Sequence, residues 1–300
     1  MTDLVSVVIP TFNRAKTLPR AIACVLAQDF QKFELVIVDD ASSDGTPRLF
    51  EGGCDSRIRF LRLAKNAGGA EARNVGWRAA RGEYVAFLDS DDEWLPDKLS
   101  KQLDVIHRAG QKTGLVYTGL LYCDPAGEVT ARRLDARRGE LAEDILATNF
   151  VGSLSSVLVR RSCLEQVAGL DRALKSCQDW DLYIRMARVC EFECVPEYLV
   201  KYLVDKQDQN RISNRSKSIV TGHKAIRKKY LSQYGELPKS KKLQHLEFLR
   251  AAHAAAADAT SVLALSWQAF WLRPGLSQLF GAFRPLARSL KRRVGALRGY

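Results

Sequence analysis

The stretch Gly82-Glu83-Tyr84-Val85-Ala86-Phe87-Leu88-Asp89-Ser90-Asp91-Asp92 joins a short apolar run to a cluster of carboxylates. The apolar run predicts a buried strand, and the carboxylates come where that strand ends. A second acidic pair, Asp39-Asp40, follows another apolar run, and a third pair is Asp179 and Asp181. Ligands of open α/β sheets bind outside the carboxyl ends of the strands. Hard cations such as Mg²⁺ and Mn²⁺ bind carboxylates together with substrate phosphates. The pattern therefore indicates an enzyme for a phosphorylated, hydroxyl-rich substrate that uses a divalent cation.

Apolar runs and helical spacing alternate through the first part of the chain. Strands are expected at 5–9, 34–38, 58–63, 83–88 and 115–123, and helices at 17–28, 46–51, 70–81, 97–109 and 178–190. Because the strands are apolar throughout, this alternation favours an α/β fold with a mainly parallel sheet that helices cover on both faces. The segment 125–140 has the composition of an exposed excursion, and the pattern is helical from about 216 onward.

The charge of the chain is divided unevenly. Residues 1–213 carry 29 basic and 31 acidic residues, whereas residues 214–300 carry 17 basic and 3 acidic residues. We therefore predict a catalytic domain at 1–213 and a helical, basic, amphipathic region at 214–300. Such an asymmetry favours contact with an anionic surface, either a membrane or a nucleic acid.

The composition of the basic region favours a membrane over a nucleic acid. Apolar residues recur at helical spacing between 276 and 297, with arginine and lysine between them, as in helices that lie in a membrane interface. The uncharged stretch 259–272 is too short to span a bilayer comfortably. We expect the C-terminal helices to bind an anionic membrane surface. The alternative is that their apolar stripe packs on the catalytic domain.

The seven cysteines are odd in number and contain no C-x-x-C pair, which favours free thiols in a reducing compartment over a zinc site. At the N-terminus, Asp3 stands where a signal peptide would be basic, and the apolar run 4–9 is too short. The sequence therefore predicts a cytoplasmic protein, peripheral on the inner face of the membrane.

The first strand and its turn, Val5–Arg14, contain neither G-x-G-x-x-G nor G-x-x-x-x-G-K-[ST]. A site without these glycine amides must neutralise phosphate in another way. A metal ion held by Asp91 would supply the positive charge. The alternative for any one carboxylate at a strand end is that it caps a helix or forms an Asx turn.

Five segments in order resemble the family 2 glycosyltransferases of GT-A fold. They are Val5–Arg14, Val38–Thr46, Asn66–Gly76, Gly82–Asp92 and Gln178–Leu182. The segment Gly82–Asp92 is similar to the metal-binding D-x-D segment of that family, and Gln178-Asp179-Trp180-Asp181-Leu182 is similar to its catalytic-base motif. The resemblance covers about residues 4–213.

The resemblance implies how a nucleotide-diphosphate sugar, most simply a UDP-sugar, would bind. Phe12 would stack on the nucleobase, Asp40 would accept a hydrogen bond from the base, and Asp39 would support the base or the ribose. Asp89 would bind ribose hydroxyls, and Asp91 would hold Mn²⁺ or Mg²⁺ at the diphosphate. The implied donor-binding residues are Pro10, Thr11, Phe12, Asn13, Asp39, Asp40, Asn66, Arg73, Asp89, Ser90 and Arg211.

Each of these assignments has an alternative. Phe12 could be a core aromatic, Asp39 and Asp40 could cap the following helix, and Arg73 could be a surface helix residue. The segment around Arg211 could be a polar linker.

On the acceptor side, the resemblance implies that Asp179 is the general base and that Trp180 and Ser153 contact the acceptor. One general base on the acceptor side and a metal ion on the leaving-group side suit a single displacement at the anomeric carbon, which inverts its configuration. Asp181 points elsewhere on a helix and is expected to be structural. Trp180 could instead pack in the core, and the segment 152–156 could be a tight entry to the next strand.

The sequence departs from the processive branch of the family. That branch carries Q-x-x-R-W after the base and has long membrane spans. Here residues 206–213 have glutamine and arginine but no tryptophan, and no apolar run is long enough to span a membrane. The resemblance then implies a non-processive enzyme that adds one sugar to a glycan or lipid-linked acceptor in cell-surface polysaccharide synthesis.

Two other functions remain open. A sugar-1-phosphate nucleotidyltransferase would share the sheet but needs a Gly-rich N-terminal loop, which Pro10–Arg14 lacks. A membrane-associated nucleotide-sugar or glycan-binding module without catalysis is disfavoured by the presence of both Asp91 and Asp179.

Overall fold

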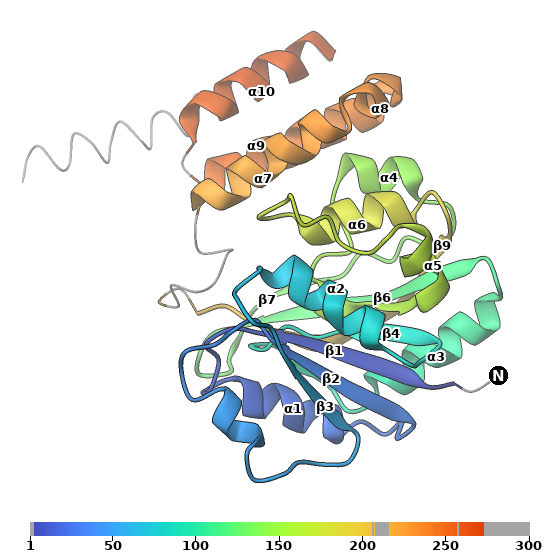
Figure 1. Cartoon of the computed structure of the whole chain (residues 1–300). Coiled ribbons are helices and arrows are strands. Elements are labelled where there is room, and N and C mark those ends of the chain that lie inside the picture. Colours follow the sequence, from blue (N-terminus) through green and yellow to red (C-terminus); the bar gives the residue numbers. More distant parts are fainter. Residues whose placement is uncertain (1–2, 206, 208–215, 257, 273–300) are drawn as a thin grey trace, which may run out of the picture. The chain divides into compact units, whose positions relative to one another are not determined.

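The computed structural model describes residues 3–205, 207, 216–256 and 258–272 (Figure 1). The chain forms two compact units. The first comprises the chain up to Ala142 together with Phe150–Ala173 and Gln178–Asp205, and the second comprises Glu143–Asn149, Leu174–Cys177 and the chain from Lys206. The boundary predicted near 213, the predicted donor residue Arg211 and the predicted amphipathic segment 276–297 lie outside the described residues, and all three stay predictions.

The first unit contains one mixed sheet. Its strands are β1 (Val5–Thr11), β2 (Phe33–Asp39), β3 (Ile58–Arg62), β4 (Tyr84–Phe87), β5 (Glu93–Trp94), β6 (Thr113–Cys123), β7 (Val129–Arg133), β8 (Leu158–Arg160) and β9 (Glu191–Leu203). They follow the order β3-β2-β1-β4-β8-β6-β9-β5, and β7 pairs with β6. Neighbours from β3 to β4 are parallel, and so are β6 and β9, whereas β8 is antiparallel to both its neighbours.

Helices connect these strands and cover both faces of the sheet. They are α1 (Leu18–Leu26), the 3₁₀ helix η1 (Pro47–Phe50), α2 (Gly69–Ala79), α3 (Lys98–Ala109), the 3₁₀ helix η2 (Leu154–Ser156), α5 (Arg161–Gln166) and α6 (Gln178–Met186). A further short helix, α4 (Ala142–Ala147), begins at the last residue of the unit's first segment.

Alternation along β1 assigns its side chains to the two faces. Val7 and Ile9 belong to one apolar core with Leu18 of α1. On the other face, a Cβ added at Gly76 of α2 would come within 2.3 Å of a methyl group of Val8. Only glycine therefore allows α2 to approach the sheet this closely. The ribbon shows α1 and α2 on opposite sides of the strands (Figure 1), which confirms the predicted α/β fold with helices on both faces.

The elements differ from the predictions in three places. The helix predicted at 46–51 is the single 3₁₀ turn η1, which ends at Phe50, one residue before Gly52 and Gly53. The helix predicted at 178–190 ends at Met186, before β9 begins. The exposed excursion at 125–140 contains β7, which forms a hairpin with β6. The long β9 had not been predicted, whereas β8 begins shortly after 152–156, in agreement with the alternative that this segment enters a strand.

The second unit is helical in its described part. It contains α7 (Ser216–Lys229), α8 (Leu231–Glu236), α9 (Lys239–Ala255) and α10 (Ala259–Leu272), as the sequence predicted. Within this unit, Lys241 pairs with Asp144, and the hydroxyl of Ser176 donates to the carbonyl of Ser218 at 2.6 Å. Among the described residues, no helix is long and apolar enough to cross a membrane.

The second unit buries three of the four histidines of the chain. The rings of His223 and His253 stack with their centroids 5.5 Å apart, and His245 stacks on Tyr234 at 4.1 Å. Burial lowers the pKa of His223 to about 4 and that of His245 to about 4. Both side chains are therefore neutral in the folded protein at neutral pH.

The helical unit is expected to lose stability as the pH falls from about 7 to about 4. An unfolded histidine titrates near pH 6.5, so in this window the unfolded state binds more protons than the folded state. The free energy of unfolding then falls by up to about 1.4 kcal/mol per pH unit for each histidine. Urea unfolding followed by circular dichroism at several pH values measures this slope. His223→Gln combined with His245→Gln should flatten it. An equally steep slope in the double variant would contradict the assignment.

Candidate functional site

Three neighbouring strands end at one edge of the sheet. In the register, Val5 of β1 lies opposite Phe33 of β2 and Tyr84 of β4, and all three strands run in the same direction. Their carboxyl ends therefore lie side by side, and the predicted donor residues follow directly from them. This edge is where open α/β sheets bind ligands.

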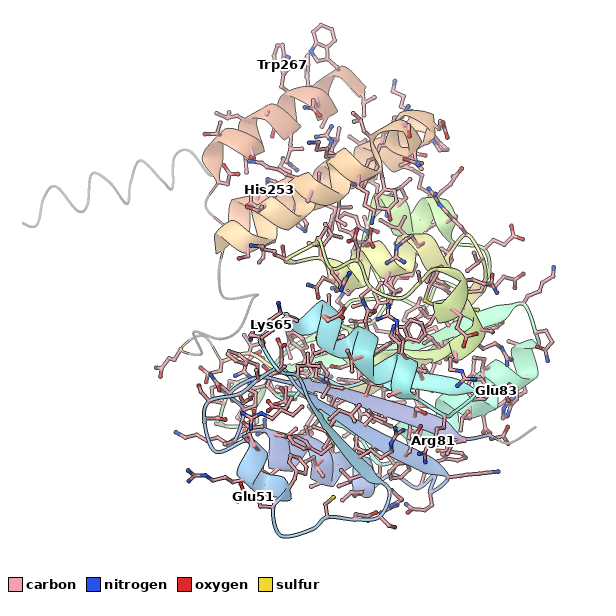
Figure 2. The ribbon with its side chains drawn as sticks, in the orientation of Figure 1. Glu51, Lys65, Arg81, Glu83, His253 and Trp267 are labelled. Carbon is pink, nitrogen blue, oxygen red and sulfur yellow. The ribbon has the colours of Figure 1, made fainter. Side chains whose placement is uncertain are left out.

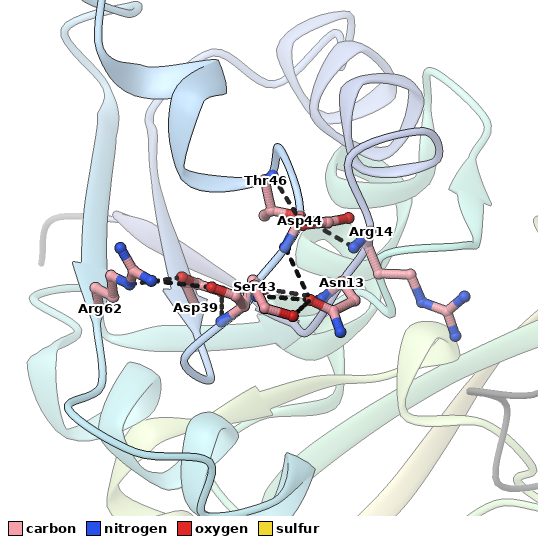
Figure 3. Close-up of polar contacts among 8 residues, drawn as sticks. Asn13, Arg14, Asp39, Ser43, Asp44, Thr46 and Arg62 are labelled. Carbon is pink, nitrogen blue, oxygen red and sulfur yellow. Dashed lines mark hydrogen bonds and ion pairs between the residues drawn. The ribbon is translucent and has the colours of Figure 1, made fainter.

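Asn13 holds the loop that follows β2 (Figure 3). Its side-chain oxygen accepts the backbone N–H groups of Ser43 at 2.8 Å and Asp44 at 3.3 Å. The backbone N–H of Arg14 donates to the hydroxyl of Thr46 at 3.0 Å. Asn13 has φ of 54°, a left-handed conformation that asparagine adopts more readily than most residues. Asn13, predicted to contact the donor, thus shapes the loop after β2 with its side-chain oxygen.

Asp39 lies at the end of β2 and is fully buried. One of its carboxylate oxygens accepts the N–H of Ser42 at 3.1 Å, and the other lies 3.3 Å from Nε of Arg62. These contacts fix the carboxylate and balance its charge. The sequence had not indicated Arg62 as its partner.

Asp40 joins β2 to the segment that precedes α2. Its two oxygens accept the N–H groups of Ala67 at 2.7 Å and Gly68 at 2.8 Å. Removal of water from the carboxylate raises the pKa of Asp40 above its usual value, although both hydrogen bonds oppose this. The same contacts hold the exposed Asn66 beside the end of β2.

The loop after β4 places two carboxylates against two arginines. Oδ1 of Asp89 lies 2.5 Å from Nη2 of Arg73, which comes from α2. Oδ2 of Asp91 lies 3.8 Å from Nη2 of Arg14, which follows β1. Arg73 therefore lies at the candidate site, and Arg14 is a site residue that the sequence analysis missed.

Asp92 has a different role from the other two carboxylates of its cluster. It is 1% exposed, and its oxygens accept the hydroxyl of Ser155 at 2.7 Å and the N–H of Leu203 at 3.2 Å. The same Ser155 hydroxyl accepts the N–H of Asp89 at 3.1 Å. Asp92 thus links the loop after β4 to η2 and to the end of β9. It also fixes the Ser155 hydroxyl that binds the backbone of Asp89.

The oxygen atoms of these carboxylates suit a hard cation. Asp89 and Asp91 offer only oxygen ligands, and Mg²⁺ or Mn²⁺ is commonly held by one or two carboxylates with substrate phosphates completing the shell. Among the described residues, no group of three or more His, Cys, Asp or Glu side chains converges as a metal site by itself. A cation at Asp91 would therefore share its coordination with the substrate.

The first turn of α6 carries the predicted base and its neighbours. Asp179 is half-buried, and Trp180 is 1% exposed. Asp181 is fully buried and forms an ion pair with Arg185, with Oδ2 2.7 Å from Nη2. Arg185 also donates to the backbone carbonyls of Val167 and Gly169. Asp181 is therefore engaged in holding α6 to the preceding loop.

Tyr183 is a fully buried residue of α6. Burial raises the pKa of Tyr183 well above its usual value, the charges of Asp179 and Asp89 raise it further, and the charges of Arg73 and Arg133 oppose them.

The loop before α6 is fixed to α2, because the side chain of Asn74 donates to the carbonyl of Leu170 at 2.8 Å and accepts its N–H at 2.9 Å. The helix that carries Arg73 thus contacts the segment that leads to the predicted base.

The remaining predicted residues lie on the same unit. Pro10 and Thr11 are buried in the last residues of β1, and Phe12 is half-buried just after them. Ser90 is 6% exposed, between the two carboxylates. Ser153 precedes η2, where its hydroxyl accepts the N–H of Ser155 at 3.1 Å. The Thr11 hydroxyl and Nε of Arg73 are buried without a hydrogen-bond partner among the described residues.

Comparison with known proteins finds a family that matches part of the chain and a relative of similar sequence. Residues 6–145 match the family described as "Glycosyl transferase family 2". TuaG of Bacillus subtilis, named for teichuronic acid biosynthesis, is 35% identical over 159 residues, which cover 52% of this chain and 62% of TuaG. The chain thus spans less than two thirds of the length of this relative.

Solved structures share the fold. The crystal structure of S. aureus TarS in complex with UDP-GlcNAc superposes with a TM-score of 0.65 and 19% identity, over 96% of this chain and 91% of that one. The mannosyltransferase PcManGT from Pyrobaculum calidifontis, in complex with GDP-Man and Mn²⁺, superposes with a TM-score of 0.60 and 22% identity. The match covers 99% of this chain and 80% of PcManGT. The chain thus resembles glycosyl transferase family 2 over residues 6–145, and it shares its fold with these two solved structures.

Proposed function

We propose that the protein is an inverting, metal-dependent, non-processive glycosyltransferase. It transfers one sugar from a nucleotide-diphosphate donor, in the first place a UDP-sugar, to a hydroxyl of a glycan or lipid-linked acceptor. The relative TuaG is named for teichuronic acid biosynthesis, which supports a role in cell-surface polysaccharide synthesis.

The observation that carries this proposal is the pair of ion pairs at the carboxyl ends of β1 and β4, Arg73 with Asp89 and Arg14 with Asp91. Arg73 belongs to α2, whose Asn74 also bonds the backbone of Leu170 in the loop that leads to α6 and Asp179. Asp91 follows Asp89 closely in the same loop. A donor held by this loop would therefore present its sugar toward Asp179, which is the arrangement that a direct transfer to an acceptor hydroxyl needs.

The chemistry follows from these positions. Asp179 would accept the proton of the acceptor hydroxyl as its oxygen bonds to the anomeric carbon and the bond from that carbon to the diphosphate oxygen breaks. Because attack and departure take place on opposite sides of the carbon, one displacement inverts its configuration. A cation held by Asp91 would stabilise the negative charge of the departing diphosphate. Arg14 and Arg73 would bind the donor phosphates when their carboxylate partners bind the cation and the ribose.

A transfer assay tests the proposal. The purified chain is incubated with Mn²⁺, a lipid-linked glycan acceptor and, in turn, UDP-, GDP-, dTDP- and CMP-sugars. We expect acceptor-dependent release of the nucleotide from one of these donors, and a product whose anomeric configuration, measured by NMR, is opposite to that of the donor. Retention of the donor configuration would contradict the single displacement.

We also propose that the protein binds an anionic membrane surface through its C-terminal helices, at the cytoplasmic face. In α10, Trp267 is 56% exposed and Trp271 is 67% exposed. Figure 2 shows Trp267 projecting outward from the helix. Exposed tryptophans beside a strongly basic segment are typical of helices that lie in a membrane interface.

Replacing Trp267 and Trp271 by alanine is expected to weaken binding to vesicles that contain anionic lipid by about 10- to 100-fold, because each ring would lose its burial in the interface. Sedimentation with phosphatidylglycerol vesicles measures this change. Leu231→Ala is the matched control, since Leu231 is 63% exposed on α8 and is not part of this face. Unchanged sedimentation of the double tryptophan variant would contradict the proposal.

A further inference from the structure

Residues 89–92 form a closed turn after β4. The N–H of Asp92 donates to the carbonyl of Asp89 at 3.0 Å, which is the hydrogen bond that closes a β-turn. Asp91 is one of the two middle residues of this turn. The proposed metal ligand therefore lies at the tip of the turn, and the backbone at its two ends sets where that tip points.

One hydroxyl holds both ends of this turn. The Ser155 hydroxyl accepts the N–H of Asp89 at 3.1 Å and donates to Oδ2 of Asp92 at 2.7 Å. Oδ1 of Asp92 accepts the N–H of Leu203, at the end of β9, at 3.2 Å. Ser155 is fully buried and Asp92 is 1% exposed. Because neither side chain presents a surface to a ligand, any effect that they have on a ligand passes through the turn.

The 3₁₀ helix η2, which contains Ser155, is fixed by contacts that do not involve this hydroxyl. Nε1 of Trp94, in β5, donates to the carbonyl of Ser155 at 2.8 Å. Nε2 of Gln102, in α3, donates to the carbonyl of Ser156 at 2.9 Å. The backbone of η2 should therefore stay in place when the hydroxyl is removed, and the turn 89–92 alone should lose its support.

We propose that Ser155 and Asp92 are positioning residues for the proposed metal site. Through the hydrogen bond between them, they hold the turn 89–92 in the conformation in which Asp89 and Asp91 act on a bound donor. The inference rests on the proposed function, and it adds two residues that touch neither the metal ion nor the donor. Groups that orient metal ligands in this way typically change metal affinity by about 10- to 100-fold when they are removed.

The test measures how much Mn²⁺ is required for a nucleoside diphosphate to bind. UDP is titrated into the purified chain at increasing Mn²⁺ concentrations, and GDP and then dTDP replace it if UDP does not bind. Calorimetry gives the Mn²⁺ concentration at which the increase in affinity is half complete. We expect Ser155→Ala and Asp92→Asn each to raise this concentration by about 10- to 100-fold, and to leave the affinity without Mn²⁺ nearly unchanged.

The two substitutions break the same link in different ways. Alanine at 155 removes both hydrogen bonds of the hydroxyl, and asparagine at 92 can accept at only one of the two positions where the carboxylate accepts. Because they act on one link, the double variant should need far less Mn²⁺ than the product of the two single effects predicts. A requirement equal to that product would show two independent contributions and would overturn the common link.

Glu34→Gln is the matched control, since it also replaces a buried carboxylate by an amide. Glu34 lies near the amino end of β2 and is 8% exposed. Its Oε1 accepts the hydroxyl of Ser6 at 2.6 Å and the N–H of Arg81 at 2.6 Å. This substitution should lower Tm, as Asp92→Asn does, and should leave the Mn²⁺ requirement unchanged. A loss of stability alone would therefore not reproduce the expected result.

The outcomes separate the two proposals. If the unaltered chain binds a nucleoside diphosphate with Mn²⁺, and both single variants need no more Mn²⁺ than it does, the positioning role is wrong and the proposed function stands. The positioning role is also wrong if Glu34→Gln raises the Mn²⁺ requirement as much as they do, since the effect then follows from stability. If the unaltered chain binds no nucleoside diphosphate with Mn²⁺, the proposed function is overturned, and this inference with it.

Discussion

Replacing Asp179 by asparagine is expected to lower the rate of sugar transfer by about 100-fold to 10,000-fold while the donor still binds. Asparagine has nearly the same shape but cannot take a proton from the acceptor hydroxyl, and general bases contribute rate factors of this size. The change should appear in kcat, since the base acts in the transition state. Nucleotide release gives the rate, and calorimetric titration with the nucleoside diphosphate gives the affinity.

Asp181→Asn is the informative comparison, because both carboxylates belong to the first turn of α6. Asp181 is fully buried and paired with Arg185, so its loss leaves a charge without its partner. We expect Asp181→Asn to lower the free energy of unfolding by about 3 kcal/mol, and Asp179→Asn to leave it nearly unchanged. If Asp179→Asn kept normal turnover, the base would have to be another group.

Replacing Asp91 by alanine is expected to remove the effect of Mn²⁺ on donor binding and to lower transfer by about 1,000-fold. A bound cation that stabilises the leaving diphosphate contributes several kcal/mol to the transition state, and Asp91 is its proposed protein ligand. Titration of the variant with UDP should give the same affinity with and without Mn²⁺.

Glu93→Ala is the matched control for Asp91→Ala. Glu93 lies two residues further on, and its Oε1 is 2.6 Å from Nε of Arg20. Because the pair is partly exposed, its loss should cost at most about 1 kcal/mol of stability and leave the metal dependence intact. A variant Asp91→Ala whose donor affinity still rises with Mn²⁺ would show that the cation binds elsewhere.

The strands that build the candidate ligand-binding edge were predictable from local sequence. β1, β2 and β4 are short apolar runs that end at polar residues, and the parallel arrangement follows from the helices between them. The register then brings their ends together without further information. β9 escaped prediction, since it carries several charged residues, and β8, which has only three residues, was expected only as an alternative after 152–156.

The individual roles of neighbouring carboxylates were not predictable in the same way. Asp91 and Asp92 are adjacent in the sequence, yet Asp91 lies near Arg14 whereas Asp92 is buried on Ser155 and Leu203. The partners of Asp92 come from η2 and β9, which are distant in the sequence. Only the folded sheet determines which carboxylate is exposed to a ligand.

Helix α6 contains one feature that the sequence predicted and one that it did not. The ion pair between Asp181 and Arg185 has helical spacing and agrees with the structural role expected for Asp181. Tyr183 has the same spacing from Asp179. Its full burial, and the lack of a hydrogen-bond partner for its hydroxyl among the described residues, appear only in the folded structure.

Calorimetric titration of the purified chain with UDP, GDP, dTDP and CMP, each with and without Mn²⁺, tests the central proposal most directly. The account predicts that one nucleoside diphosphate, in the first place UDP, binds in the presence of Mn²⁺ and binds much more weakly without it. Absence of binding for every nucleotide under both conditions would contradict a nucleotide-sugar site at the ends of β1, β2 and β4.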